Sequence, residues 1–157
     1  MSLKSKKIST VISLVLTVLL FAALLFVTYW LPDVVTSMID AKDNLGNREN
    51  ITDTGRALIL ADAYAMVAVA FVAVALLALL LREVWCGKVF GKKATRLLAA
   101  VSWCCFAEGA LVILVTVQFQ LAAVASVAVC FVGLCLRVVK NVLEEAARIK
   151  AENDFTI

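Results

Sequence analysis

The residue in the most unusual setting for chemistry is Glu108, which lies about midway along an apolar run of residues 97–117. If that run crosses a membrane, an unpaired charge at its centre costs at least about 2.5–3.5 kcal/mol. Glu108 is therefore expected to face other helices, a partner or a water pocket, where it could hold a proton or a cation. The alternative is a neutral acid hydrogen-bonded to Ser126, a glutamine or a backbone carbonyl.

Asp62 is the second carboxylic acid within an apolar run, and it lies nearer the start of its run. An acid close to the membrane surface can be hydrated at little cost. The rise of 1.5 Å per helical residue separates the depths of Asp62 and Glu108 by roughly 10 Å, so a directly paired dicarboxylate is not the first expectation. The candidate intramembrane polar site consists of Asp62, Glu108 and Ser126.

No recognisable catalytic constellation accompanies these acids. The chain has no histidine, which excludes Ser/His/Asp sets and HExxH zinc motifs, and it has no glycine-rich phosphate loop. The cysteines include no CxxC pair and are expected to be small apolar fillers. We therefore predict a protein that is not an enzyme and uses no metal or cofactor. The five cysteines are Cys86, Cys104, Cys105, Cys130 and Cys135.

Four apolar segments must position these groups, at about residues 8–31, 57–81, 97–117 and 121–136. A bilayer core about 30 Å thick needs roughly 20 apolar helical residues to cross it. Lipid offers no partners to backbone polar groups, so each crossing is expected to be a helix. With 64% hydrophobic and 17% charged residues, the chain could not build a water-facing surface. The sequence predicts one domain over residues 1–157, an all-α integral membrane four-helix bundle.

Basic residues predict the orientation. All but Lys42, Arg48 and Arg56 of the 15 Lys and Arg residues lie in the N-terminus, the 82–96 connection or the C-terminal tail. The positive-inside rule then places both termini in the cytoplasm. The 82–96 loop is expected to face anionic lipid, which accounts for its charge without a nucleic-acid site. Its basic residues are Arg82, Lys88, Lys92, Lys93 and Arg96.

The connections between the spans differ in character. Pro32 is expected to end the first helix, because proline removes a backbone hydrogen bond. The outer connection that follows, over residues 33–56, begins with a short amphipathic face that is expected to lie along the membrane surface. Residues 118–120 join spans three and four so closely that the two must form an antiparallel hairpin. The amphipathic face consists of Val34, Val35, Met38 and Ile39.

Small residues in the fourth span form a seam that would let a neighbouring helix approach closely. Beyond this span, a helix of about residues 137–152 is expected to continue into the cytoplasm, with Glu144 and Arg148 at pairing distance. The tail beyond it is a candidate surface for docking a partner. The seam consists of Ala122, Ser126, Cys130 and Gly133. The helix beyond it carries an apolar stripe of Val139, Leu143 and Ala146. The tail consists of Glu152, Asn153, Asp154, Phe155, Thr156 and Ile157.

Residues 139–146 and 149–157 resemble the closing sequence of a bacterial membrane family known as domain of unknown function 2975. Its members end near Glu-Asn-Asp-Leu-Thr-Ile, and this chain departs from that ending with Phe155. The turn from Gly87 to Phe90 is also similar. The resemblance implies a four-helix protein of the bacterial cytoplasmic membrane with no known activity. Because the family's genes often lie beside a helix-turn-helix regulator, it also implies a regulatory partner.

Together these features favour a non-enzymatic sensing, regulatory or interaction protein that engages a cytoplasmic partner through its tail. The alternative is a small transporter or immunity-type factor that binds a ligand near Glu108. A third reading is a subunit that contacts another membrane protein, or a second copy of itself, through the small-residue seams. The expected surroundings are the lipid bilayer, with no direct contact to nucleic acid.

Overall fold

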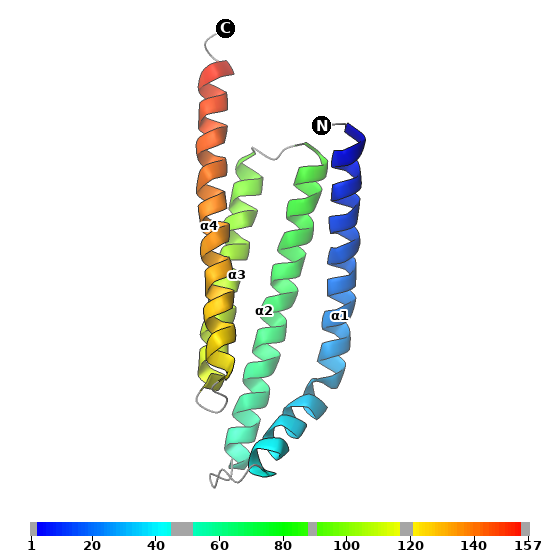
Figure 1. Ribbon diagram of the computed structural model, residues 1–157, viewed down its shortest axis with the longest axis vertical. Coiled ribbons are helices and arrows are strands. Elements are labelled where there is room, and N and C mark those ends of the chain that lie inside the picture. The colour runs from blue at the N-terminus through cyan, green and yellow to red at the C-terminus, as the bar shows by residue number, and fades with distance from the viewer. Residues whose placement is uncertain (1–2, 45–51, 88–90, 117–120, 155–157) are drawn as a thin grey trace.

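Four long helices make up the computed structural model of the protein (Figure 1). The structure describes residues 3–44, 52–87, 91–116 and 121–154, and the side chains of residues 3–10, 42–44, 121 and 154 are not among those described. Each helix is long and apolar enough to cross a membrane, which confirms the predicted all-α, four-helix class. The helices are α1 (Leu3–Asn44), α2 (Asp53–Trp85), α3 (Lys92–Thr116) and α4 (Leu121–Asp154).

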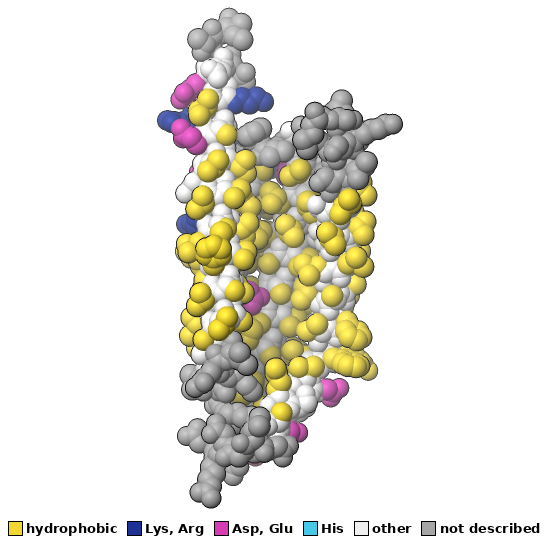
Figure 2. All heavy atoms as spheres, viewed as in Figure 1, with side chains coloured by type: hydrophobic (Ala, Val, Ile, Leu, Met, Phe, Trp, Pro, Cys, Tyr) yellow, Lys and Arg dark blue, Asp and Glu magenta, His cyan; other side chains and the backbone are white. Residues whose placement is uncertain are grey.

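The helices contact one another only in chain order. Within the described ranges, α1 packs on α2, α2 on α3 and α3 on α4, whereas α4 touches neither α1 nor α2. The arrangement is therefore an open row and not the closed bundle that the sequence predicts. Lipid covers apolar helix faces as well as another helix does, so no hydrophobic force closes the row. Figure 2 shows apolar side chains over most of the visible face.

Helix α1 continues through Pro32 to Asn44, so the prediction that Pro32 ends the helix is wrong. The helix bends in this region, as expected where proline removes one hydrogen bond (Figure 1). Burial explains the continuation, because the next turns pack Val35 and Ile39 against α2. Val34 and Met38 remain exposed. Half of the amphipathic face predicted for the membrane surface is thus part of the protein core.

Helices α3 and α4 form the predicted antiparallel hairpin, and two reciprocal hydrogen bonds join them. The Ser102 hydroxyl donates to the Gly133 carbonyl oxygen at 2.8 Å, and the Ser126 hydroxyl donates to the Gly109 carbonyl oxygen at 2.9 Å. Both serines are buried, at 0% and 2% exposure. Because each helix carries a serine seven residues before a glycine, the two bonds are related by a local two-fold axis. This register fixes how far the two helices can slide.

The two glycines let the helices of this hairpin approach closely. A Cβ atom on Gly109 would come within 3.0 Å of Cys130 Sγ, and one on Gly133 would come within 3.1 Å of Cys105 Cβ. Ser126, Cys130 and Gly133 of the predicted seam therefore all contact α3. Cysteines fill the space that the glycines leave, as expected of small apolar side chains.

Both termini and the α2–α3 connection lie at the same end of the molecule (Figure 1). At this end α4 extends past the first turn of α3 as an unbroken helix to Asp154. The predicted helical continuation beyond residue 136 is thus observed. The side of the membrane to which this end belongs stays a prediction from the distribution of Lys and Arg.

Candidate functional site

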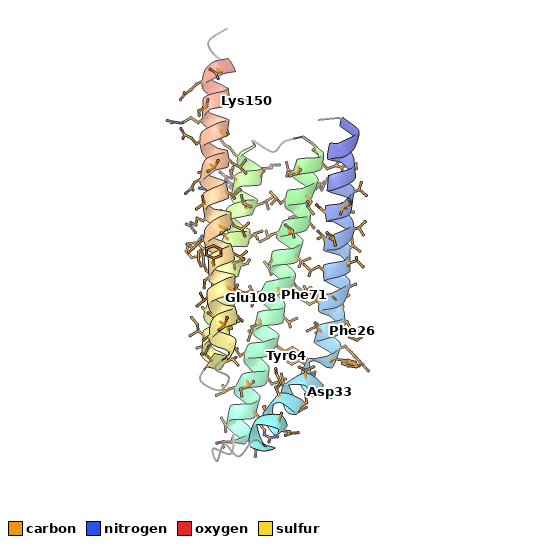
Figure 3. The ribbon with its side chains drawn as sticks, viewed as in Figure 1. Phe26, Asp33, Tyr64, Phe71, Glu108 and Lys150 are labelled. Atoms are coloured by element: carbon orange, nitrogen blue, oxygen red, sulfur yellow. The ribbon has the colours of Figure 1, made fainter. Side chains whose placement is uncertain are left out.

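Glu108 lies in the middle of α3 and is half-buried (Figure 3). The neighbouring helix α2 supplies Asp62, and the carboxyl groups of Asp62 and Glu108 interact electrostatically. No hydrogen bond joins the two acids in the described structure. The sequence predicts separate depths for them, but the packing of α2 on α3 brings the two charges into one electrostatic environment.

The surroundings of Asp62 are drier than expected of a residue at a wet interface. Its Oδ2 atom is buried and accepts no hydrogen bond from the described part of the chain. A buried polar atom without a partner costs roughly 1–3 kcal/mol. Asp62 is thus a position at which a proton or a bound cation would be stabilising.

Ser126, the third predicted member of this site, has a structural role in the hairpin. Its hydroxyl proton is donated to the Gly109 carbonyl and is not shared with Glu108. No hydrogen bond joins Ser126 and Glu108 in the described part of the chain, and a neutral Glu108 bonded to Ser126, a glutamine or a backbone carbonyl stays a prediction. Ser126 instead fixes the turn of α3 that follows Glu108.

Two cysteines, Cys104 and Cys105, precede Glu108 by about one helical turn and so lie on the same side of α3. Among the described residues, no three His, Cys, Asp or Glu side chains come together to hold a metal ion.

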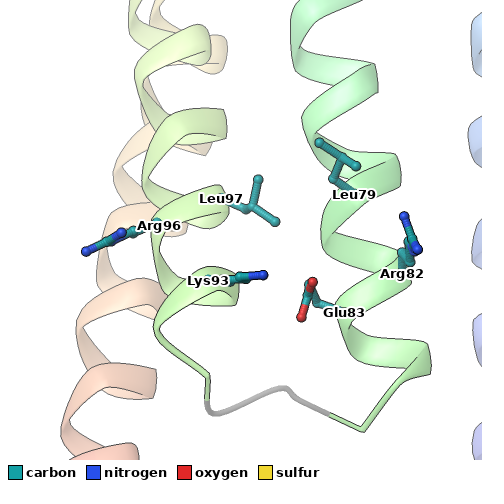
Figure 4. A pocket seen from close by; sticks show the side chains of 6 residues that line it. All are labelled: Leu79, Arg82, Glu83, Lys93, Arg96 and Leu97. Atoms are coloured by element: carbon teal, nitrogen blue, oxygen red, sulfur yellow. The ribbon is translucent and has the colours of Figure 1, made fainter.

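The basic residues of the 82–96 region line a pocket of about 300 Å³ between α2 and α3 (Figure 4). Figure 4 shows Glu83 and Lys93 directed into the space between the two helices. Arg82 and Arg96 lie at its edges, and Lys88 lies outside the described residues. Three of the predicted basic residues, Arg82, Lys93 and Arg96, thus line a recessed site, and the lipid-facing role of the loop stays a prediction.

A larger pocket of about 600 Å³ lies between the first turns of α3 and the extended part of α4. No single segment of the chain predicts this pocket, because its two walls lie about 50 residues apart in the sequence. The residues that line it are Lys92, Thr95, Arg96, Glu144, Ala147, Arg148 and Ala151.

The tail helix carries two ion pairs, which differ from the pair expected between Glu144 and Arg148. Lys140 Nζ bonds Glu144 Oε2 at 2.6 Å, and Arg148 bonds Glu145 Oε1 at 2.5 Å. Glu144 thus pairs with the base four residues before it, and Arg148 pairs with the acid three residues before it, on the surface of the same helix. Basic and acidic side chains are gathered on this end of α4 (Figure 2).

The end of the predicted docking tail is only partly described. Glu152, Asn153 and Asp154 form the last turn of α4, and Glu152 and Asn153 are exposed. Phe155, Thr156 and Ile157 lie outside the described residues. The exposed large apolar side chains that the structure describes on this part of α4 lie earlier in the helix, at Val138, Val139, Val142 and Ile149.

One contact at the base of this extension was not predicted. The Arg137 guanidinium carbon lies 4.9 Å from the centre of the Trp103 ring, a cation–π contact between α4 and α3. Tryptophan and arginine are typical of the membrane–water boundary. The pair lies close to residue 136, where the fourth span is predicted to end.

These features define an α-helical membrane protein with four candidate spans, a pair of interacting acids among them and a basic, helical extension at one end. A family model described as "Protein of unknown function (DUF2975)" matches residues 3–157. The chain therefore belongs to this family, as the sequence of its tail indicates. No curated protein and no solved structure matches the chain.

Proposed function

We propose that the protein is a non-enzymatic component of the bacterial cytoplasmic membrane that holds a cytoplasmic regulator on the extended end of α4. The observation that carries this proposal is an exposed apolar face on α4 that begins beside the first turns of α3 and continues along the extended end of the helix. Val138 is 62% exposed, Val142 is 61% exposed and Ile149 is 49% exposed. Their spacing of four and seven residues puts all three on one side of the helix.

The direction of α4 argues that protein, not lipid, covers this face. The extension continues the line of the spanning helix (Figure 1), so with the fourth span ending near residue 136, as the sequence predicts, it would lead away from the bilayer. Val142 and Ile149 would then lie beyond the reach of lipid tails. An amphipathic helix with such a face commonly binds in an apolar groove of another protein. The surface ion pairs at Glu144 and Glu145 keep the extension helical without covering this face.

The test compares two neighbouring substitutions. Val142→Asp places a charge on the apolar face, whereas Asn141→Asp adds the same charge at an exposed position without removing an apolar group. We expect Val142→Asp to reduce co-purification of the regulator encoded beside the gene by at least about tenfold, since burying an unpaired charge costs several kcal/mol. Asn141→Asp should retain it. Equal capture by both variants would refute the proposal.

A truncation separates the helix from the tail beyond it. Removing residues 152–157 deletes the family's closing sequence but keeps Val142 and Ile149. If the tail adds its own contacts, capture falls in this variant as well. If the exposed face is sufficient, capture is retained while Val142→Asp still abolishes it. Loss in neither variant would leave α4 without a binding role.

A second function, the binding of a cationic ligand within the membrane, is favoured by the interacting acids alone. Glu108 and Asp62 lie on adjacent helices, and the buried Asp62 Oδ2 has no hydrogen-bond partner in the described structure. We expect Glu108→Gln to lower binding of a hydrophobic cation, tetraphenylphosphonium, by about tenfold or more. Ser126→Ala, which loosens the hairpin but keeps both acids, is the control. Unaltered cation binding in Glu108→Gln would remove this second function.

A further inference from the structure

We propose that the pocket between α3 and the extended end of α4 binds a phosphate group, of the kind carried by phospholipid headgroups and by phosphorylated metabolites. The pocket has a volume of about 600 Å³, within the range of small-molecule sites. Lys92 and Arg96 come from its α3 wall and Arg148 from its α4 wall. Three cations from two helices can surround one anion, which a single basic loop could not do.

The ion pairs around the pocket leave it positively charged. Glu144, the acid in its lining, is bound to Lys140, which is not part of the lining. Arg148 is bound to Glu145 in the same way. Lys92 and Arg96 make no ion pair with any residue that the structure describes. The pocket thus keeps two uncompensated positive charges, which is the balance that a phosphate monoanion or dianion would neutralise.

The chemistry of the lining suits phosphate more than a carboxylate chain or a cation. An arginine guanidinium can donate two parallel hydrogen bonds to phosphate oxygens, and a lysine ammonium adds a point charge. Ala147 and Ala151 line the α4 wall without filling the space. The first turn of α3 also directs the positive end of its helix dipole toward this end of the molecule.

The height of the pocket matches that of phospholipid phosphates. It begins just beyond residue 97, where the third span is predicted to start, and beyond the Arg137–Trp103 contact at the boundary. A headgroup phosphate at this level would bridge α3 and the base of the α4 extension. This role is independent of the proposed regulator, because the exposed face of Val138, Val142 and Ile149 is not part of the pocket lining.

Two lysines on the same helical turn give a matched test. Lys92 lines this pocket, whereas Lys93 is absent from its lining and instead lines the pocket between α2 and α3. Both are exposed, so neither Lys92→Gln nor Lys93→Gln should disturb the fold, which circular dichroism verifies. The measurement is retention of phosphatidylglycerol, against phosphatidylcholine, by the detergent-purified full chain in native mass spectrometry. Titration with inorganic phosphate forms the second arm.

We expect Lys92→Gln and Arg148→Gln each to weaken phosphatidylglycerol binding by about tenfold, the usual value of a charge-assisted hydrogen bond to phosphate. Lys93→Gln should change it by less than about threefold. Displacement of the lipid by inorganic phosphate, or phosphate binding without lipid binding, would support the site and identify a soluble ligand. Equal losses in Lys92→Gln and Lys93→Gln, or no binding of either probe, would overturn the proposal.

Discussion

The Gly109–Cys130 contact gives the sharpest prediction about the hairpin that positions Glu108. A Cβ atom on Gly109 would lie under 3.0 Å from Cys130 Sγ, whereas ordinary contacts begin at 3.4 Å. Gly109→Ala therefore requires a movement of more than 0.4 Å by the thiol or by the whole helix. Overpacking of this kind costs about 1–3 kcal/mol. Alanine also favours a helix over glycine by up to about 1 kcal/mol, so the net expected loss of stability is about 0–2 kcal/mol.

Removing the obstructing atom should change the sign of that effect. In a chain that already carries Cys130→Ala, the added methyl group of Gly109→Ala fills the space that Sγ has left. Gly109→Ala should then stabilise the hairpin by up to about 1 kcal/mol. The two substitutions are thus expected to couple by about 1–3 kcal/mol.

The assay unfolds the purified chain in mixed micelles with increasing sodium dodecyl sulfate and monitors the loss of helix by circular dichroism. It is applied to the wild type, to both single variants and to the double variant. A cycle in which Gly109→Ala has the same effect with and without Cys130 would refute the close contact. In that case the hairpin would have a different register from the one that the two serine bonds describe.

Two further predictions concern packing elsewhere in the row. Ile39→Ala should destabilise the chain by about 2 kcal/mol or more in the same unfolding assay, because Ile39 is only 1% exposed. Met38→Ala is the control, since Met38 is 55% exposed, and it should change the stability by less than about 0.5 kcal/mol. Equal effects of the two substitutions would contradict the observed continuation of α1 beyond Pro32. Ser102→Ala should lower the free energy of unfolding by about 0.6 kcal/mol, the average contribution of a hydrogen bond between membrane helices. A change indistinguishable from zero would argue against the bond from Ser102 to Gly133.

The helices themselves could be predicted from the sequence because lipid permits few alternatives. Long apolar runs that must satisfy their own backbone groups can only be helices, and the short link at residues 118–120 makes spans three and four antiparallel neighbours. The seam at Ser126, Cys130 and Gly133 was also visible, since small residues at helical spacing permit close approach. The matching Ser102 and Gly109 on α3 repeat the same seven-residue spacing, and comparing the two spans would have revealed the register.

Other features depend on packing that no single segment encodes. The expected end of the first helix at Pro32 was wrong because burial of Val35 and Ile39 on α2 outweighs one lost hydrogen bond. The interaction of Asp62 with Glu108 depends on how α2 packs on α3, which estimates of depth along separate helices do not contain. The open row likewise could not be read from composition, because an apolar helix face is equally suited to lipid and to protein.

The most direct test of the account is the water accessibility of α4 along its length. In a chain whose five native cysteines are replaced, Phe131→Cys and Ile149→Cys report on the spanning and extended parts of the helix. A membrane-impermeant maleimide should label Ile149→Cys in inverted vesicles and not in intact cells, and should label Phe131→Cys in neither. Labelling of Ile149→Cys from outside the cell, or ready labelling of Phe131→Cys, would contradict a helix that crosses the membrane and emerges in the cytoplasm.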